Sequence, residues 1–556
     1  MCGIWCLFRS GAHEVASIYT STLLKRGPEQ LDVWRSHTAA GQQFAFGFTR
    51  LAINGLNPKG MQPFHLDTPK GRITWMVNGE IYNWQQLADE HGLSLDLKTG
   101  SDCEVLGHLY ARFADQDNGL ETLFRSLDGV FSVAIWDQAK QQFIVARDPY
   151  GVRPLYYSHQ AAEDSVENFG LITTCVASEL KAFPIGSNPK AFPPGHYATM
   201  NPTQFAPSLL VSQYHSIPFL KNPSLINYES AKEHIYHALL AAVRKRVHCT
   251  ERPIGALLSG GIDSSLIAAL VQKVLKEESK PPLKTFSIGF EGSEDLKHAR
   301  LVAEHIGSDH YEIVATPDQF FAAIPEVIEA IESYDLTTVR ASVGNYLVSK
   351  YIKNNTNCKV IFNGDGSDEI FGSYLYFYRA PTDTEYEAEV TRLLKDIHMF
   401  DVLRSDRSIS SNGLEARTPF LDRQFVATAR SVPTQHLRPR QGQKVEKQLL
   451  RDAFAGTGIL PEAVVRRRKE AFSDAVNGAE VSWKDEILRR VESLVPEGWQ
   501  KLGDTKEQAY YRLLFDTTKA ARTLGTNYTN PNCQYRWLPR WSGETTDPSA
   551  RTLSIY

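Results

Sequence analysis

A short apolar run leads into a loop rich in glycine and serine in the stretch Ile254-Gly255-Ala256-Leu257-Leu258-Ser259-Gly260-Gly261-Ile262-Asp263-Ser264-Ser265. The run predicts a buried strand, and the spacing of the apolar residues beyond the loop predicts a helix over residues 264–277. The glycines and the helix start present backbone N–H groups, so the loop predicts a phosphate or pyrophosphate site. An ordinary glycine turn with a helix cap is the alternative interpretation. The pattern of a Walker loop and the Gly-x-Gly-x-x-Gly spacing of a dinucleotide site are both missing, which excludes those two classes.

Apolar runs and amphipathic helical segments continue to alternate beyond this loop. Strands are predicted at residues 284–290 and 359–362, and a helix at 293–306. The alternation predicts a doubly wound, mainly parallel α/β domain with extra helices. In such a sheet the ligand binds at the carboxyl ends of the strands.

A second loop, Asn363-Gly364-Asp365-Gly366-Ser367-Asp368-Glu369, also follows a predicted strand. Three carboxylates lie within five residues of this loop, and they repel one another unless a cation lies between them. Mg²⁺ that bridges to phosphate oxygens is the usual solution. We therefore predict a magnesium site made by Asp263 and Asp368.

The first half of the chain has a different pattern, with short strands separated by turns. Strands are expected at 44–48, 73–77, 130–136, 143–146 and 171–177, and helices at 84–91 and 102–113. This pattern predicts a layered antiparallel domain with helices. A proline-rich stretch follows it, so we expect one domain at residues 2–208 and a second at 209–556.

The charge balance and the cysteine content of the chain limit the kinds of partner and cellular compartment that we expect. The 556 residues include 60 basic and 64 acidic side chains, with a net charge of −4, which gives no reason to expect nucleic acid or a membrane as partner. Seven scattered cysteines without a Cys-x-x-Cys pair argue against a disulfide framework. With no predicted signal peptide or membrane span, we expect a reduced cytoplasmic protein. A homodimer is compatible with this composition.

Cysteine at the second position has a specific chemical consequence. Once Met1 is removed, Cys2 carries both a thiol and a free α-amine, whose ordinary pKa is about 7.7 to 8.0. Cys2 is then able to act as nucleophile and general base at once. A cysteine that is near the start by chance is the alternative, and the motifs of the next two hundred residues argue against it.

Motifs in both halves resemble one family, the glutamine-hydrolysing asparagine synthetases. Those of the first half resemble an N-terminal-nucleophile glutamine amidotransferase domain of class II: Cys2-Gly3-Ile4, Lys25-Arg26-Gly27-Pro28, Arg50-Leu51-Ala52-Ile53, Asn78-Gly79-Glu80-Ile81-Tyr82-Asn83, Thr99-Gly100-Ser101-Asp102, Leu127-Asp128-Gly129 and Arg147-Asp148. Those of the second half resemble an ATP-pyrophosphatase synthetase domain: the serine-glycine loop, Ser308-Asp309-His310, Thr337-Thr338-Val339-Arg340-Ala341-Ser342, Tyr374-Leu375-Tyr376-Phe377, Lys469-Glu470-Ala471-Phe472-Ser473-Asp474 and Thr546-Asp547-Pro548-Ser549-Ala550-Arg551.

The resemblance implies an αββα Ntn-hydrolase-like domain and an activity. The enzyme is expected to make L-asparagine from L-aspartate through β-aspartyl-AMP, with ATP as co-substrate, Mg²⁺ as cofactor and ammonia taken from L-glutamine. Glutamate, AMP and pyrophosphate are the expected by-products. A related synthetase that adenylates another carboxylate, as in β-lactam ring closure, is the alternative, as is a non-enzymatic relative.

The resemblance also implies roles for particular residues. Cys2 is the expected nucleophile, with Asn78 and the Gly79 N–H as oxyanion donors. Asp365 is the expected acid or base, and Lys469, with Arg467 or Arg468, is expected to bind pyrophosphate. Glutamine is expected to bind Arg50, Leu51, Ala52, Ile53, Asn54, Asn78, Gly79, Glu80 and Asp102. ATP is expected to bind Leu258, Ser259, Gly260, Gly261, Asp263, Ser264, Ser265, Ile288, Asn363 and Gly364, and Arg340 is a candidate for aspartate.

Several positions depart from the family pattern. Lys25 and Glu29 replace a histidine and an aspartate around Arg-Gly-Pro, and Arg9 stands where a small residue is usual. Asn363-Gly364-Asp365 replaces Ser-Gly-Glu, which makes the expected acid one methylene shorter. We expect either an inward shift of this loop or a water molecule that relays the proton.

Overall fold

The computed structural model describes residues 1–161, 172–204, 207–219, 221–442, 444–467, 482–503, 505–525, 528–533 and 538–543. The chain forms two compact units. The first comprises Met1–Ser216, Ser410–Leu414 and Thr518–Pro531, and the second Ile217–Ile409, Glu415–Thr517 and Asn532–Tyr556. The sequence did not predict the two late segments of the first unit, and the limits 2–208 and 209–556 stay a prediction.

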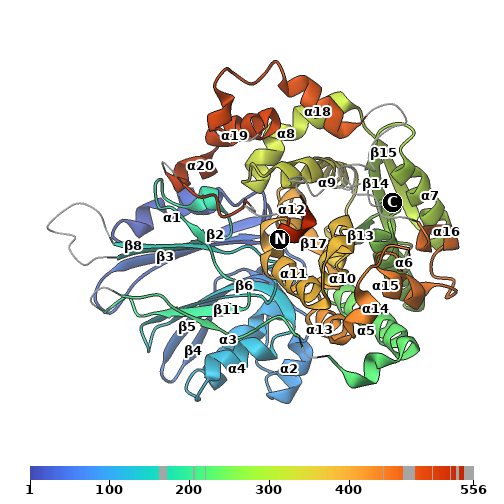
Figure 1. The fold of residues 1–556 in the computed structure, drawn as a ribbon. Coiled ribbons are helices and arrows are strands. Elements are labelled where there is room, and N and C mark those ends of the chain that lie inside the picture. The colour runs from blue at the N-terminus through green and yellow to red at the C-terminus, as the bar shows by residue number, and fades with distance from the viewer. Residues whose placement is uncertain are drawn as a thin grey trace. The chain divides into compact units, whose positions relative to one another are not determined.

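Two six-stranded antiparallel sheets make up the first unit (Figure 1). The order of one is β10-β8-β9-β1-β3-β2 and that of the other β12-β11-β7-β6-β5-β4. The first sheet contains β1 Gly3–Phe8, β2 Gln30–His37, β3 Gln43–Arg50, β8 Tyr156–Ala161, β9 Ile172–Ala177 and β10 Lys190–Ala191. The second contains β4 Phe64–Thr68, β5 Gly71–Ile81, β6 Gly129–Asp137, β7 Gln142–Arg147, β11 His196–Met200 and β12 Leu210–Gln213.

Side chains from the facing surfaces of the two sheets form one core. Phe8 stacks on Phe44 with ring centroids 4.9 Å apart, and Phe44 lies 4.7 Å from Trp136 of the other sheet. Helices cover the outer faces: α1 Ala12–Ser21 packs on β3, and α2 Trp84–Glu90, α3 Val105–Phe113 and α4 Gly119–Ser126 join the core of the second sheet. The antiparallel αββα prediction is confirmed.

A five-stranded parallel sheet is the centre of the second unit. Its order is β15-β14-β13-β16-β17, so the chain winds outward from β13 in one direction and then returns to continue beyond β13 in the other. The strands are β13 Ile254–Leu257, β14 Lys284–Gly289, β15 Asp309–Val314, β16 Val360–Phe362 and β17 Glu415–Arg417. The direction reverses between β13 and β16, and the loops after these two strands are the two that the sequence singled out.

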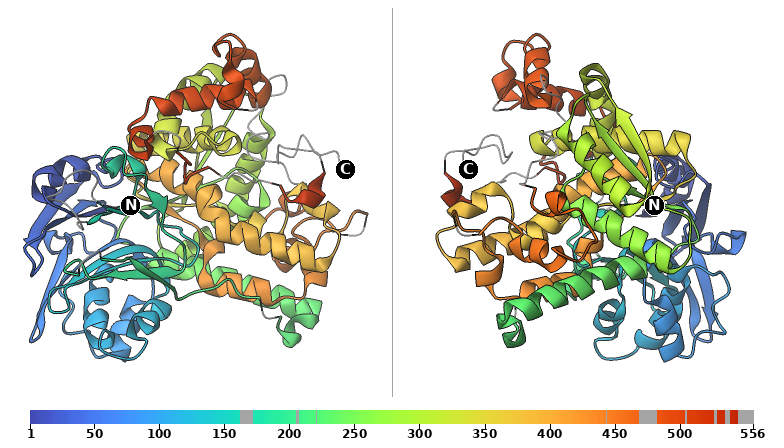
Figure 2. Two further views of the ribbon diagram at one scale, coloured as in Figure 1. Left: turned by 60° about the vertical axis from the view of Figure 1, so that its left-hand side comes forward. Right: turned by 90° about the vertical axis from the view of Figure 1, so that its right-hand side faces the viewer.

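Helices surround this sheet, as the views of Figure 2 show. They are α5 Tyr228–His248, α6 Ile262–Glu277, α7 Glu294–Ile306, α8 Pro317–Ile331, α9 Leu336–Asn355, α10 Ser367–Phe371, α11 Asp383–Asp396, α12 Asp401–Ser410, α13 Arg423–Ser431, α14 Thr434–Leu437, α15 Gln448–Phe454, α16 Glu462–Val465, α18 Trp483–Val491 and α19 Lys506–Asp516, while α20 Lys519–Leu524 belongs to the first unit. The doubly wound prediction is confirmed. Helix α6 begins at Ile262, two residues earlier than predicted, because Gly261 in extended backbone already serves as its N-cap.

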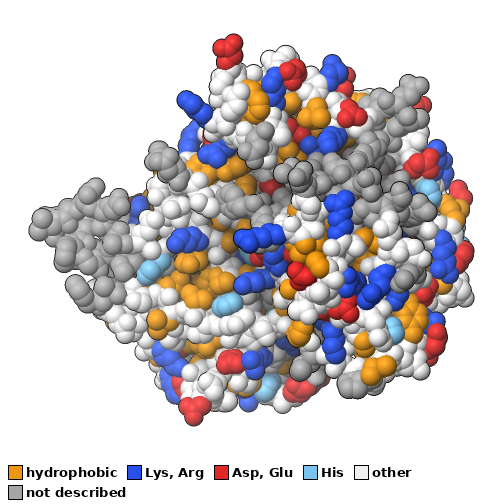
Figure 3. All heavy atoms as spheres, in the orientation of Figure 1, with side chains coloured by type: hydrophobic (Ala, Val, Ile, Leu, Met, Phe, Trp, Pro, Cys, Tyr) orange, Lys and Arg blue, Asp and Glu red, His pale blue; other side chains and the backbone are white. Residues whose placement is uncertain are grey.

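Acidic and basic side chains are interspersed on the face drawn in Figure 3. Among the described helices, none is both long and apolar enough to span a membrane.

Candidate active sites

Cys2 lies immediately before β1, an interior strand of its sheet. Its thiol lies 3.6 Å from the carbonyl oxygen of Leu51, to which it donates. Its own carbonyl accepts a hydrogen bond of 2.9 Å from Nε of Arg26. Arg26 is fully buried and also donates to Glu179 at 3.1 Å and to Oγ of Ser410 at 2.9 Å. The backbone of the predicted nucleophile is therefore held by a buried, charge-assisted hydrogen bond.

Asn78 lies on β5 and is 0 % exposed, yet neither Oδ1 nor Nδ2 has a hydrogen-bond partner among the described residues. A buried amide without partners costs about 1–3 kcal/mol, so such groups are rare unless a ligand completes them. An oxyanion needs a donor that is already fixed before the reaction. The unpartnered amide of Asn78 meets that need.

Gly79 follows Asn78 with φ of 151°. A Cβ atom there would lie 2.0 Å from the carbonyl oxygen of Val130 on the paired strand β6. Only glycine fits, because the close pairing of β5 and β6 leaves no room for a side chain.

Two predicted acids of the first unit share one amide donor. Asn54 donates from Nδ2 to Glu80 Oε2 at 2.7 Å and to Asp102 Oδ1 at 3.2 Å. The other oxygen of Asp102 accepts from the backbone N–H of Ile81 at 2.7 Å. Both carboxylates are buried, so they form an acidic pair suited to an ammonium group.

Arg50 lies at the end of β3 and is held by the loop that follows it. Its guanidinium donates to the carbonyl oxygens of Asn57 at 3.0 Å and Gly55 at 2.5 Å. Glu29, one of the departures, accepts from the backbone N–H of Ala52 at 2.9 Å, so the longer acid supports this loop. Leu51, Ala52 and Ile53 are buried. The structure thus brings together the predicted residues at positions 2, 50–54, 78–80 and 102.

In the second unit, the two loops at the reversal of strand order touch. A Cβ atom on Gly364 would lie 2.6 Å from the backbone nitrogen of Ser264 and 2.7 Å from the carbonyl carbon of Asp263. Within the first loop, Ser259 N donates to Ser264 Oγ at 3.1 Å. Leu258 and Ile288 are buried near the ends of their strands. The predicted ATP-binding residues therefore lie on adjoining loops and strand ends.

Lys447 joins the two predicted metal ligands. Its Nζ lies 2.6 Å from Asp263 Oδ2 and 2.5 Å from Asp368 Oδ1, and the side chain is 2 % exposed. Burial lowers the pKa of Lys447, but the two carboxylates outweigh burial and the pKa is raised. One ammonium thus lies between the two acids that we expect to bind a cation.

Oxygen atoms on the two loops and the helices that follow them suit Mg²⁺. Asp263 Oδ1, Ser265 Oγ and Ser367 Oγ are buried without a hydrogen-bond partner among the described residues. Carboxylate and hydroxyl oxygens are the donors that this hard cation prefers.

Asp365, the shortened acid, has an ion-pair partner on α12. Arg404 Nη2 lies 2.8 Å from Asp365 Oδ1 and 2.9 Å from Asp401 Oδ1. Asn363 donates to Ser405 Oγ at 2.5 Å, and its Oδ1 accepts from the backbone N–H of Asp365 at 3.4 Å. Both departures in this loop are therefore held by neighbouring residues of one helix.

Glu369 is a further acid of this loop and is completely buried. Burial raises its pKa well above the usual range, and repulsion from Asp401 and Asp368 adds to the rise. Tyr374, in a predicted motif, donates to its carboxyl group. This acid therefore favours its neutral form beside the charged residues of the site.

Arg340, the candidate residue for binding aspartate, forms a buried ion pair with Glu507. Its guanidinium donates to Glu507 of α19 at 2.6 Å and 2.5 Å in a bidentate pair, and only 6 % of Arg340 is exposed. Arg467 pairs with Asp295 at 2.9 Å. Arg468 and Lys469 lie outside the described residues. The roles of these basic residues stay predictions, and aspartate binding requires Arg340 to change partner.

Both domains match known families. Residues 1–231 match the family model for the glutamine amidotransferase domain, and residues 234–391 and 381–542 match that for asparagine synthase. The chain is 40% identical over 588 residues to an asparagine synthetase [glutamine-hydrolyzing] of Gallus gallus, covering 100% of this chain and 99% of that protein. The corresponding protein of Homo sapiens is 38% identical over 589 residues, with the same coverage. The chain belongs to the glutamine-hydrolysing asparagine synthetase family.

Membership in this family confirms the predicted resemblance and the prediction of an enzyme. Among solved structures, an allosteric regulatory enzyme of purine biosynthesis is 15% identical with a TM-score of 0.33, over 57% of this chain and 81% of that chain.

Sequence reasoning missed several charged residues of the synthetase unit. Lys447, Arg404 and Glu507 each pair with a predicted site residue, and Ser405 holds another. None of them lies in a loop with a recognisable phosphate or metal pattern. Only the long-range contacts identify them.

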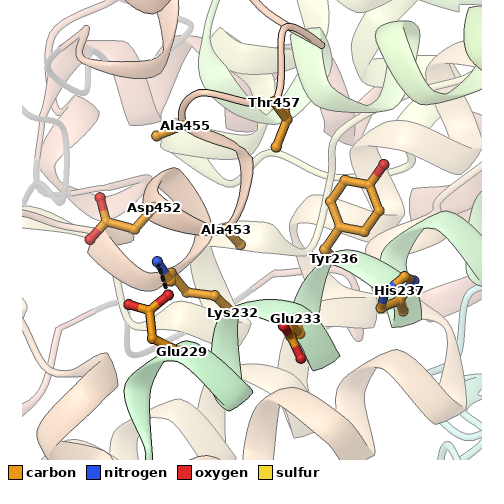
Figure 4. A pocket seen from close by; sticks show the side chains of 9 residues that line it. All are labelled: Glu229, Lys232, Glu233, Tyr236, His237, Asp452, Ala453, Ala455 and Thr457. Atoms are coloured by element: carbon orange, nitrogen blue, oxygen red, sulfur yellow. Dashed lines mark ion pairs between the residues drawn. The ribbon is translucent and has the colours of Figure 1, made fainter.

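A hollow elsewhere in the second unit lies between α5 and the end of α15 (Figure 4). Lys232 and Glu229 form an ion pair of 2.6 Å on one side, and Asp452 and Tyr236 line it as well. It contains none of the predicted site residues. Its described lining includes no glycine loop of the kind found at the reversal of strand order.

Proposed function

We propose that this chain makes L-asparagine from L-aspartate, with ATP as co-substrate and L-glutamine as the source of ammonia. After removal of Met1, the thiol of Cys2 attacks the side-chain amide carbon of glutamine, and its α-amine takes the thiol proton and passes it to the departing ammonia. Water then cleaves the thioester to give glutamate. Asn78 and the Gly79 N–H donate to the oxyanion.

The remaining residues of the first site orient glutamine. Arg50 binds the α-carboxylate, for which it must exchange at least one carbonyl partner. Glu80 and Asp102 face the α-ammonium group. Their shared donor, Asn54, keeps the two carboxylates together when no ligand is bound.

In the second site, a β-carboxylate oxygen of aspartate attacks the α-phosphorus of ATP, and the bond to pyrophosphate breaks to give β-aspartyl-AMP. Ammonia attacks the carbonyl carbon, AMP departs with the bonding electrons, and a proton passes to Asp365. Asp263 and Asp368 would hold Mg²⁺, which would neutralise phosphate charge when bound. The Ser259–Ser265 loop and Gly364 bind the phosphates through backbone N–H groups.

The observation that supports this proposal most is the pair Asp263 and Asp368 beside the glycine loop, where the parallel sheet reverses its strand order. A ligase that adenylates another carboxylate is favoured less, because Cys2, Asn78 and Asp102 are all present. The test is to mix the protein with ATP, Mg²⁺, aspartate and glutamine and to quantify the products by mass spectrometry. Equal amounts of asparagine, AMP and pyrophosphate are expected. Release of ADP and phosphate, or AMP without asparagine, contradicts the proposal.

A further inference from the structure

Helix α12 supports both unusual positions of the loop after β16. Arg404 is ion-paired with Asp365 at 2.8 Å, and the next residue, Ser405, accepts from Asn363 at 2.5 Å. These two loop positions are where the chain departs from Ser-Gly-Glu. Their supports are adjacent on one helix, so a shift of that helix moves both.

The ion-pair cluster of Arg404 is largely shielded from water. The side chains of Arg404, Asp365 and Asp401 are 17 %, 15 % and 13 % exposed, and one nitrogen of Arg404 contacts both acids. Burial lowers the pKa of Arg404, but Asp401 and Asp365 outweigh burial and raise it. An ion pair in such surroundings fixes geometry more firmly than an exposed pair does.

Asn363 links the same loop to α12 through hydrogen bonds. Its amide NH₂ reaches Ser405, and its amide oxygen accepts from the backbone N–H of Asp365 at 3.4 Å. A serine at this position has a single oxygen on a shorter side chain, which is unable to span both partners. The larger residue thus ties the backbone of Asp365 to α12.

We propose that α12 is the positioning element of the acid-base loop, in which Arg404 orients the Asp365 carboxylate and Ser405, through Asn363, holds the backbone that carries it. Arg404 is then a positioning residue, because it acts through Asp365 and does not touch the substrate. This inference rests on the proposed function, in which Asp365 transfers a proton. It explains how a short acid serves where the family has a longer one, since α12 holds it in place from both ends of the Asn363–Asp365 segment.

The test is a double-mutant cycle on the ammonia-dependent reaction, measured as pyrophosphate release with ammonium salts. The variants are Arg404→Met, Asp365→Asn and the double variant, with Arg404→Lys as the conservative change. Arg404→Met is expected to lower kcat by about 10–100-fold while the KM values for ATP and aspartate change less than about threefold. Arg404→Lys restores kcat to within about tenfold of wild type. In the Asp365→Asn background, Arg404→Met should lower kcat by less than about a further threefold, because the carboxylate that Arg404 orients has already been removed.

Two controls separate positioning from loss of structure. The KM values for ATP and aspartate and the midpoint of urea unfolding report whether the second unit is folded, and glutaminase activity reports the same for the first unit. Arg392→Met removes a similar ion pair on α11, where Arg392 lies 2.7 Å from Glu389, and is expected to leave kcat unchanged.

Three results overturn the inference: additive effects in the cycle, a raised KM for aspartate with kcat kept in Arg404→Met, or an equal loss of kcat in Arg392→Met. A wild-type protein that releases no AMP and pyrophosphate from ATP and aspartate instead contradicts the proposed function. The two failures are therefore distinguishable.

Discussion

The two candidate sites differ in how their polar groups are satisfied when no ligand is bound. In the first unit, the buried amide of Asn78 has no partner among the described residues. In the second, charged site residues have partners inside the protein: Lys447 lies between Asp263 and Asp368, and Arg404 pairs with Asp365. One site is preformed around a neutral group, and the other is held by ion pairs.

The difference follows from the free energy of burial. An unpaired neutral amide costs about 1–3 kcal/mol, which a folded protein tolerates. An unpaired buried charge costs several kcal/mol, so a site for ATP and a metal ion needs internal counter-ions before its ligands arrive. Binding at the second site therefore exchanges ionic partners, whereas the oxyanion at the first site gives the Asn78 amide a partner that it lacks among the described residues, although Arg50 exchanges a carbonyl partner there too.

Cys2→Ala gives the largest expected effect and tests whether the two sites are chemically separate. Glutamine hydrolysis should be lost completely, because no other group replaces the thiol, while pyrophosphate release with ammonium salts stays within about twofold. Glutamate and pyrophosphate are measured on the same sample, after mass spectrometry of wild type has verified that Met1 is removed. Loss of both activities in a folded variant would show that the sites are not separate.

Asp263→Asn and Asp368→Asn should each lower ammonia-dependent synthesis by roughly 10³-fold, since each removes a charge expected to bind Mg²⁺. Glutaminase activity should be unchanged. Asp396→Asn on α11, which removes an acid 3.5 Å from Arg392, is the matched control and should be near wild type. Full synthesis in either site variant rules out the metal assignment.

Asn78→Ala should lower kcat for glutamine hydrolysis by about 10²–10³-fold, the usual effect of losing one oxyanion donor. The free energy of unfolding should change by less than about 1 kcal/mol, because the Asn78 amide has no hydrogen-bond partner to lose among the described residues. Asn54→Ala is the contrast: it deprives Glu80 and Asp102 of their shared donor and should destabilise the protein more. Urea unfolding gives the free energy of unfolding of both variants. A large loss of stability in Asn78→Ala contradicts the preformed site.

Asp365→Glu and Asn363→Ser should have the smallest effects, below about tenfold in the ammonia-dependent rate. Asp365→Glu alone should not accelerate the enzyme, because the longer acid crowds a site held by Arg404 for a shorter one. The double variant should restore or raise the rate. Strictly additive effects on pyrophosphate release would mean that the two positions are not coupled.

The sequence predicted what depends on local pattern. Short apolar runs bounded by turn residues located β5 and β6, and the helical spacing after the glycine loop located α6, because burial favours apolar residues at neighbouring positions of one element. The sites at Cys2 and Asp263 followed from motif chemistry. Lys447 was not predictable in this way, since it lies 184 residues from Asp263 and no local pattern links them. The return of Ser410–Leu414 to the first unit is likewise a tertiary contact without a sequence signal.

The affinity of the ATP-free protein for Mn²⁺, a spectroscopic substitute for Mg²⁺, measures directly whether Lys447 replaces the metal as counter-ion. Wild type, Lys447→Met and the control Lys444→Met are titrated and followed by electron paramagnetic resonance. Lys444 is a suitable control because its Nζ donates to the carbonyl oxygen of Gln435 at 2.6 Å and not to a predicted metal ligand. If the ammonium and the metal ion compete for Asp263 and Asp368, Lys447→Met should bind Mn²⁺ at least about tenfold more tightly, a change of about 1.4 kcal/mol. Lys444→Met should match wild type. Unchanged or weaker Mn²⁺ binding by Lys447→Met would contradict the exchange of partners at the second site.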